Sequence, residues 1–232
     1  MKILVGVATY QRPKKLERLI NSLYQQTYTN FDIFIVFDNN DYISAEYVHS
    51  KFPKVNIKVL EGNNYVIGCW NLIHKIKGYD AHLTLVDDVE LYPNTIEETV
   101  KAMKTNFPDL DGVIGLSQEC PGHPEYTSKV SFGQTMVGKT FLERYKEVDY
   151  KFCCTAYSHF YQDEEMYMFA NSLNKFVHSK EAILKHFHPA FLPNEMDSTH
   201  LIVRGKIIKE DTIIFNKRKQ KGLIWGKSWG LL

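Results

Sequence analysis

The chain has 232 residues, of which 44% are hydrophobic and 24% are charged, and its formal net charge is +1. A chain of this length can bury the core of one large α/β domain, which suits it better than two small domains. The near-zero net charge gives no whole-chain electrostatic case for binding nucleic acid or membranes, and no apolar run is long enough to span a bilayer.

The cysteines and the first residues both indicate a cytoplasmic protein. None of the four cysteines is spaced as a metal ligand, and we expect reduced, buried thiols. They are Cys69, Cys120, Cys153 and Cys154. Residues 1–7 are too short and too strand-like for a signal peptide.

The first half of the chain alternates apolar runs rich in β-branched residues with amphipathic segments. The apolar runs are typical of strands that are buried on both faces. The pattern predicts strands over 2–9, 31–37, 56–60 and 82–86, and helices starting at Pro13, around 45–51, over 68–76 and over 95–103. Strand-helix alternation of this kind predicts a doubly wound, mainly parallel sheet.

Parallel sheets bind ligands at the carboxyl ends of their strands. We therefore expect the functional residues directly after the strands, at 9–12, 38–41 and 87–90. Beyond residue 107 the pattern is less regular. We expect short strands at 112–116 and 133–137, a loop at 119–128 and a helix at 163–173. The segment from residue 190 is the least regular.

Acidic side chains cluster after the strand at 82–86, where Asp87, Asp88 and Glu90 follow one another closely. Packed carboxylates repel, so a cation should lie among them. Oxygen ligands suit Mg²⁺ or Mn²⁺, which in turn suit diphosphates. On the residues alone, an ordinary turn before a helix is an equally good interpretation.

The segment 86–93, VDDVELYP, resembles the acidic metal-binding signature of GT-A glycosyltransferases, both family-2 enzymes and N-acetylglucosaminyltransferase-like ones. The resemblance implies that Asp88 ligates the Mn²⁺ or Mg²⁺ ion that holds the diphosphate of a nucleotide-sugar donor. Asp87 would contact the ribose or sugar of that donor. The third acid of the usual motif is displaced to Glu90, which would be a further metal ligand.

Two segments near the N-terminus also resemble that family. Residues 8–13, ATYQRP, are similar to its P-T-Y-N-R segment, with alanine at the first position. This implies that Thr9, Tyr10 and Arg12 bind the donor, with Tyr10 able to stack on the base. Residues 22–39 closely resemble the block S-x-x-x-Q-T-x-x-x-F-E-I-x-V-V-D-D-x-S.

That block places Asp38 on the family's acid that accepts a hydrogen bond from the uracil imide, which favours a UDP-sugar. Asn64 belongs to a segment that resembles a looser helix-start motif and would also bind the donor. For a lone aspartate such as Asp38, capping a turn is the commoner role.

The sequence QDEEM at 162–166 resembles the E-D-x-D-L motif that begins the acceptor-side helix of inverting family-2 enzymes, with Gln162 in place of the first glutamate. The resemblance implies that Asp163 is the catalytic base that takes the proton of the acceptor hydroxyl, and Glu165 is the next candidate. Ordinary acids at a helix N-terminus are the alternative interpretation.

Two further regions contribute candidate residues. His186 and His188 lie where some family members supply a histidine to the metal or the pyrophosphate. The basic tail at 206–227 contains the segment 211–222, which resembles the C-termini of small stand-alone glycosyltransferases, some of them viral, and Arg218 would contact the leaving group. Such a tail is also commonly a solvated helix with a packing tryptophan.

The resemblance implies a GT-A domain over 1–190, with a nucleotide-sugar-binding half at 1–105 and an acceptor half at 106–190. A C-terminal basic tail at 191–232 would pack on it. We expect a metal-dependent, inverting glycosyltransferase in the cytoplasm, or in the host cytoplasm if the protein is viral.

The acceptor would be a carbohydrate or glycoconjugate, in solution or at a membrane surface, and DNA is disfavoured by the net charge. A non-catalytic nucleotide- or sugar-binding relative remains an alternative. A nucleotidyltransferase is another, although it would normally have a glycine-rich loop after the first strand, where this chain has ATYQRPKK at 8–15.

Overall fold

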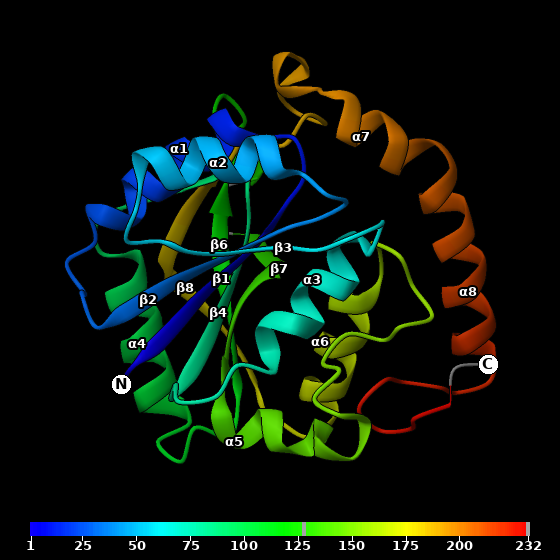
Figure 1. Ribbon diagram of the computed structural model, residues 1–232. Helices are drawn as coiled ribbons and strands as arrows, with labels where there is room; N and C mark the ends of the chain where they lie inside the picture. Colours follow the sequence, from blue (N-terminus) through cyan, green and yellow to red (C-terminus); the bar gives the residue numbers. More distant parts are fainter. Residues whose placement is uncertain (127–128, 231–232) are drawn as a thin grey trace.

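The first strand is buried on both faces, as its continuous apolar sequence predicted. Ile3, Val5 and Val7 pack into one hydrophobic core and Leu4 packs into another, because successive side chains of a strand point to opposite faces. The structure, a computed structural model, describes residues 1–126 and 129–230. It contains a central sheet with helices on both faces (Figure 1).

The first half of the chain alternates strands and helices as predicted. Its elements are β1 (Ile3–Thr9), α1 (Pro13–Tyr24), β2 (Phe31–Phe37), α2 (Tyr42–Lys51), β3 (Asn56–Val59), α3 (Tyr65–His74), β4 (Ala81–Val86), β5 (Val89–Leu91) and α4 (Thr95–Asn106). The bounds of β1 to β4 agree with the predicted ones to within one residue, whereas β5 was not predicted. Helix α2 begins earlier than expected because the Asp41 carboxylate accepts a hydrogen bond from the Ser44 N–H group and caps its N-terminus.

The second half adds β6 (Val113–Glu119), β7 (Lys129–Gly138), α5 (Lys139–Leu142), α6 (Gln162–Ser172), β8 (Phe176–His186), α7 (Ser198–Ile202) and α8 (Ile208–Gln220). Residues 127–128 of the expected loop lie outside the described residues. The sequence did not indicate β8, whose middle residues Lys180 and Glu181 are exposed and polar and whose register with β6 shifts. The segment from residue 190 is more helical than expected.

The eight strands lie in the order β3-β2-β1-β4-β7-β6-β8-β5. The pairs β2–β3, β1–β2, β1–β4 and β6–β8 are parallel, whereas β4–β7, β6–β7 and β5–β8 are antiparallel. This is the mainly parallel, Rossmann-like sheet of the GT-A fold that the sequence predicted. Apolar side chains of α1, α2 and α4 fill the core on one face of the sheet, and those of α3 and α6 contribute to the core on the other.

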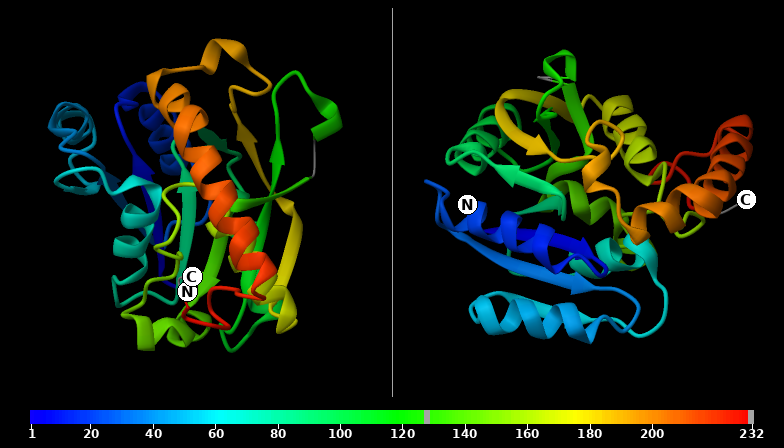
Figure 2. Two further views of the ribbon diagram at one scale, coloured as in Figure 1. Left: turned by 90° about the vertical axis from the view of Figure 1, so that its right-hand side faces the viewer. Right: turned by 90° about the horizontal axis from the view of Figure 1, so that it is seen from above.

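The helices α7 and α8 form an arm along one side of the molecule, with a π-helical turn at Val203–Ile207 between them (Figure 2). The arm packs against the core on the α3 and α6 face of the sheet, through Phe215 of α8 and through Trp225, which follows α8. No helix in the described part of the chain is long and apolar enough to cross a membrane.

Candidate active site

The carboxyl ends of β1, β2 and β4 lie side by side. Thr9 at the end of β1 pairs with Phe37 of β2, and Ala8 pairs with Val86 of β4. The residues that follow these strands therefore emerge at the same edge of the sheet, as the parallel topology predicted.

A pocket of about 450 Å³ opens at this edge. Its walls come from the ends of the three strands, the start of α3, the loop before α6, the end of β8 and the helical arm. Among the residues predicted from the sequence, it is lined by Thr9, Tyr10, Arg12, Asp38, Asp87, Asp88, Asp163, His186 and His188. Segments far apart in the sequence thus meet around one cavity.

Asp87 is held by the residues that follow β1. Its Oδ2 atom accepts a hydrogen bond from the Thr9 hydroxyl at 2.7 Å, and its Oδ1 atom accepts one from Nη1 of Arg12 at 2.9 Å. The carboxylate is thereby fixed and its charge is compensated within the protein. Asp87 and Arg12 therefore form part of the pocket wall before any ligand arrives.

Asp88 lies between two imidazoles. Nε2 of His186 is 3.3 Å from its Oδ1 atom, and Nε2 of His200 is 3.6 Å from its Oδ2 atom. Burial alone would raise the pKa of Asp88, whose side chain is only 5% exposed. The contacts with His186 and His200 outweigh burial and hold this pKa well below its usual value, so the side chain is an anion at neutral pH.

The surroundings of Asp88 fit a divalent cation only if a bound ligand supplies part of the coordination. Within residues 1–126 and 129–230, no group of three or more His, Cys, Asp or Glu side chains is arranged to hold a metal ion. Asp88 and His186 nevertheless offer one oxygen and one nitrogen donor at the pocket wall, a donor set compatible with a divalent metal. Diphosphate oxygens would be suitable partners for the remaining positions.

Asp38 organises the start of α3. Its Oδ1 atom accepts hydrogen bonds from the backbone N–H of Asn64 at 2.9 Å and from Nδ2 of Asn64 at 3.2 Å, and its Oδ2 atom accepts one from the N–H of Tyr65 at 2.8 Å. Asn64 therefore contacts Asp38, while its neighbour Tyr65 lines the pocket. A carboxylate has about four lone-pair positions, so one acceptor position remains.

Asp163 is the second residue of α6 and lines the pocket. Burial raises its pKa, although nearby backbone N–H groups at the helix N-terminus oppose the shift. A partly buried carboxylate with a raised pKa holds a proton more readily than a fully exposed one, which suits a general base.

The structure does not bring Glu165 or Arg218 to the pocket. Glu165 is 1% exposed and Arg218 is fully buried, and they form an ion pair with Nε of Arg218 2.6 Å from Oε1 of Glu165. Glu165 also accepts hydrogen bonds from the Tyr157 hydroxyl at 2.5 Å and from the Trp225 N–H at 2.7 Å. This network joins α6 to α8 inside the protein, so neither side chain can reach a donor or acceptor from its observed position.

Glu90 also lies away from the pocket. It is the middle residue of β5, opposite Lys185 of β8, and its Oε1 atom forms an ion pair with Nζ of Lys185 at 3.0 Å. Its neighbours Val89 and Leu91 point into the core, so strand alternation turns Glu90 to the other face. A metal ligand role for Glu90 does not follow from this position.

Several pocket residues from the loop before α6 and from the helical arm were not predicted from the sequence. They include His159, Phe160, Thr199, His200 and Arg204. Burial lowers the pKa of His159 to about 4, so its imidazole is neutral near pH 7. The sequence Asp197-Ser198 is a helix-start signal, and the Asp197 carboxylate indeed accepts a hydrogen bond from the His200 N–H.

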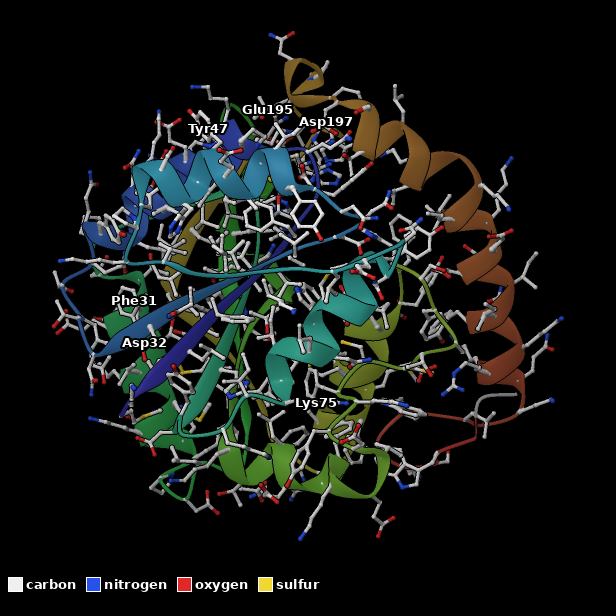
Figure 3. The ribbon with its side chains drawn as sticks, viewed as in Figure 1. Phe31, Asp32, Tyr47, Lys75, Glu195 and Asp197 are labelled. Atoms are coloured by element: carbon white, nitrogen blue, oxygen red, sulfur yellow. The ribbon has the colours of Figure 1, made fainter. Side chains whose placement is uncertain are left out.

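Ion pairs fasten the start of the arm to α1. Nη2 of Arg12 donates to Oδ1 of Asp197 at 3.0 Å, and Nζ of Lys15 lies 2.9 Å from Oδ2 of the same carboxylate. Arg18 forms a further pair with Glu195 at 3.0 Å. Glu195 and Asp197 lie close together at the N-terminal end of the arm (Figure 3). Arg12 thus links Asp87 to the arm that closes one side of the pocket.

The sheet, its strand order and the pocket at the strand ends define a GT-A fold. A sequence model of glycosyl transferase family 2 matches residues 4–165, and the chain belongs to that family. It is therefore a glycosyltransferase. The matched region includes Asp38, Asp87, Asp88 and Asp163, and it ends before β8 and the arm. No curated protein sequence matches the chain.

Crystal structures of TarS from S. aureus share this fold. Residues 1–349 of TarS superpose with a TM-score of 0.62 at 16% identity, covering 86% of this chain and 68% of that one. The same TarS region in complex with UDP-GlcNAc superposes with a TM-score of 0.61 at 18% identity, covering 81% of this chain and 59% of that one. A further TarS structure superposes with a TM-score of 0.61 at 15% identity, covering 86% of this chain and 41% of that one. Identities this low show the fold alone.

Proposed function

We propose that this protein transfers a sugar from a UDP-sugar to an acceptor hydroxyl, in a metal-dependent reaction that inverts the anomeric carbon. The observation that supports this most strongly is the meeting of Asp38, Asp88 and Asp163 around a single pocket. The three carboxylates come from two strand ends and a helix start, and each suits a different part of the reaction.

The uridine would bind where β1 and β2 end. The remaining acceptor position of Asp38 suits the imide N–H of uracil, which needs an acceptor. Tyr10 lines the same end of the pocket, where its ring can stack on the base, and its hydroxyl accepts a hydrogen bond from Nδ2 of Asn39 at 3.3 Å. The crystallisation of TarS with UDP and with UDP-GlcNAc supports the same donor class.

The diphosphate would lie beside Asp88. Asp88 and His186 are the residues that would hold Mn²⁺ or Mg²⁺, with His188 and His200 next to them. When bound, the ion would neutralise the negative charge that grows on the departing diphosphate. Arg204 of the arm lines the pocket and is a cation that can contact the same phosphates. We assign the leaving-group contact to Arg204 in place of the buried Arg218.

The acceptor would enter on the side of α6. Asp163 takes the proton from the acceptor hydroxyl as its oxygen attacks the anomeric carbon, and the bond from that carbon to the diphosphate oxygen breaks. One displacement of this kind inverts the anomeric centre and releases UDP. The acceptor class that we propose is a carbohydrate or glycoconjugate.

Sugar release to water tests this proposal without knowledge of the acceptor, because water can replace the acceptor hydroxyl. In the presence of Mg²⁺, which unlike paramagnetic Mn²⁺ does not broaden proton signals, we expect slow hydrolysis of one α-linked UDP-sugar, and proton NMR monitors it. The first sugar released should be the β anomer, since the reaction inverts. A sample with EDTA should show no release, and the known mutarotation rate of the free sugar corrects the time course.

The outcomes separate the parts of the proposal. Initial release of the α anomer would contradict inversion and leave the donor assignment intact. Release from a GDP-sugar and not from any UDP-sugar would show that the uridine assignment is wrong. Equal release in EDTA would contradict the metal dependence.

A further inference from the structure

Asp211 of α8 is buried against the loop that precedes α6. It is 1% exposed, and its carboxylate accepts hydrogen bonds from three successive backbone N–H groups. Oδ1 accepts from Ser158 at 3.0 Å, and Oδ2 accepts from His159 and Phe160 at 2.8 Å each. Hydrogen bonds to an ionised acceptor are stronger than those between neutral groups, so a single side chain of the arm fixes this backbone.

Tyr161, the next residue of the loop, also contacts α8. Its hydroxyl is 2.8 Å from Oγ1 of Thr212, and its ring stacks on Phe215 with centroids 4.5 Å apart and planes inclined by 11°. Tyr161 has a φ of 66°, a left-handed conformation that costs free energy for a residue with a side chain. Contacts with α8 on consecutive residues therefore hold a backbone turn that the loop alone would not favour.

This turn determines where α6 begins. Tyr161 is the N-cap residue of α6, and Asp163 follows two residues later. His159 and Phe160, whose N–H groups bond to Asp211, line the pocket themselves. A change in the backbone at residues 158–161 would therefore move two pocket side chains and would turn Asp163 as well.

We propose that Asp211 is a positioning residue for the transfer reaction: from the helical arm, it fixes the loop at 158–160 so that Asp163 faces the acceptor. This inference rests on the proposed function, because it takes Asp163 as the base. It gives the arm, which lies beyond the matched family region, a role in catalysis through another residue. Asp211 itself touches no substrate.

Asp211→Asn is the substitution that tests this role most cleanly. Asparagine has almost the same shape, but one of the two carboxylate oxygens is replaced by an amide nitrogen. This nitrogen is a donor, so it cannot accept a hydrogen bond from the backbone N–H group that it would face. The loop should loosen while α8 keeps its packing through Phe215. Asp111→Asn is the matched control, because Asp111 is a buried carboxylate paired with Arg144 and Lys175 and does not line the pocket.

Five quantities are measured on the full chain: the dissociation constant for UDP with Mn²⁺, the rate constant for hydrolysis of the preferred UDP-sugar at saturation, the pH dependence of that rate, amide hydrogen exchange, and the melting temperature. In Asp211→Asn we expect the hydrolysis rate to fall by about tenfold to a hundredfold, a size typical of misplaced catalytic groups. The UDP dissociation constant should stay within about twofold, because Asp38 and Asp88, which we assign to the uridine and the diphosphate, are held by contacts that do not involve this loop.

The pH profile distinguishes positioning from general destabilisation. The rate depends on ionised Asp163, so it is lost as the pH falls through the pKa of that group. Burial raises this pKa in the wild type. If the loop opens and admits water, the pKa should fall towards its usual value, and the acid limb of the profile should move to lower pH. The control Asp111→Asn should lower only the melting temperature.

Hydrogen exchange tests the inference independently of activity. Faster exchange confined to residues 158–163 in Asp211→Asn is expected, and unchanged exchange there would overturn the inference. The inference would also be overturned if the hydrolysis rate and the acid limb of its pH profile were unchanged. A parallel loss of rate, UDP affinity and melting temperature would overturn it too, because that pattern indicates general destabilisation. If the wild type hydrolyses no UDP-sugar, the proposed function fails, whereas the exchange result still decides whether Asp211 holds the loop.

Discussion

Asp163→Asn should lower the rate of sugar transfer to water by about 10² to 10⁴, the range that a general base contributes. Asparagine keeps the size of the side chain and removes its ability to take a proton. Because the role that we propose for Asp163 concerns the acceptor and not the nucleotide, the affinity for UDP with Mn²⁺ should change little. Steady-state release of UDP from the preferred UDP-sugar and calorimetric binding of UDP measure the two effects separately.

The neighbouring Glu164→Gln is the matched control. Glu164 lies in the same first turn of α6 but does not line the pocket. Its substitution should leave the rate within about twofold of the wild type, since surface changes away from the reacting groups have small effects. A full rate in Asp163→Asn would show that another group takes the proton, and a retaining mechanism would then have to be considered.

Glu165→Ala should destabilise the folded protein by about 3–5 kcal/mol, the usual loss when one partner of a buried ion pair is removed. The substitution leaves the fully buried guanidinium of Arg218 without its carboxylate, and the N–H of Trp225 loses its acceptor. Urea unfolding at constant slope measures the change in the free energy of unfolding. If this variant does not fold, Glu165→Gln keeps the shape of the side chain and allows the comparison.

A double-mutant cycle with Arg218→Met tests whether the two side chains act as a pair. The double variant should lose clearly less stability than the sum of the single variants, because removing both charges leaves none unpaired. Additive losses would contradict the pairing. A folded Glu165→Gln protein of normal stability that is inactive would instead favour a catalytic role for Glu165.

The strand ends were predictable from the sequence because continuous β-branched runs determine where buried parallel strands end. Thr9, Asp38 and Asp87 follow from that pattern and from the rule that ligands bind at strand ends. Their meeting around one pocket needed only the parallel registers of β1, β2 and β4.

Secondary-structure geometry explains which site residues were misplaced. Glu165 follows Asp163 by two residues, and two residues of an α-helix turn by about 200°, so the two carboxylates point to opposite sides of α6. Glu90 lies opposite Lys185 in a strand whose other side chains enter the core. Arg218 lies three residues after Phe215 and therefore shares its buried helix face.

The contribution of the arm could not be read from the sequence. His200 and Arg204 line the pocket at the start of an arm that is held there in part by Arg12 and Lys15, from the other end of the chain, which pair with Asp197. Likewise, Asp211 reads as an ordinary acid in the first turn of a helix, and its three N–H partners lie about fifty residues earlier in the chain. Such long-range contacts leave no local pattern of spacing or periodicity.

The most direct test of the central claim, a UDP-sugar donor held through Asp88 and a divalent ion, is a thermal-shift comparison of UDP, GDP, dTDP and CDP. Each nucleotide is added with and without Mn²⁺ to the wild type, to Asp88→Asn and to the control Glu90→Gln. A ligand that binds only the folded state raises the melting temperature. We predict stabilisation by UDP that needs Mn²⁺, survives in Glu90→Gln and disappears in Asp88→Asn. No stabilisation by UDP, or a shift that is the same in Asp88→Asn, would contradict the claim.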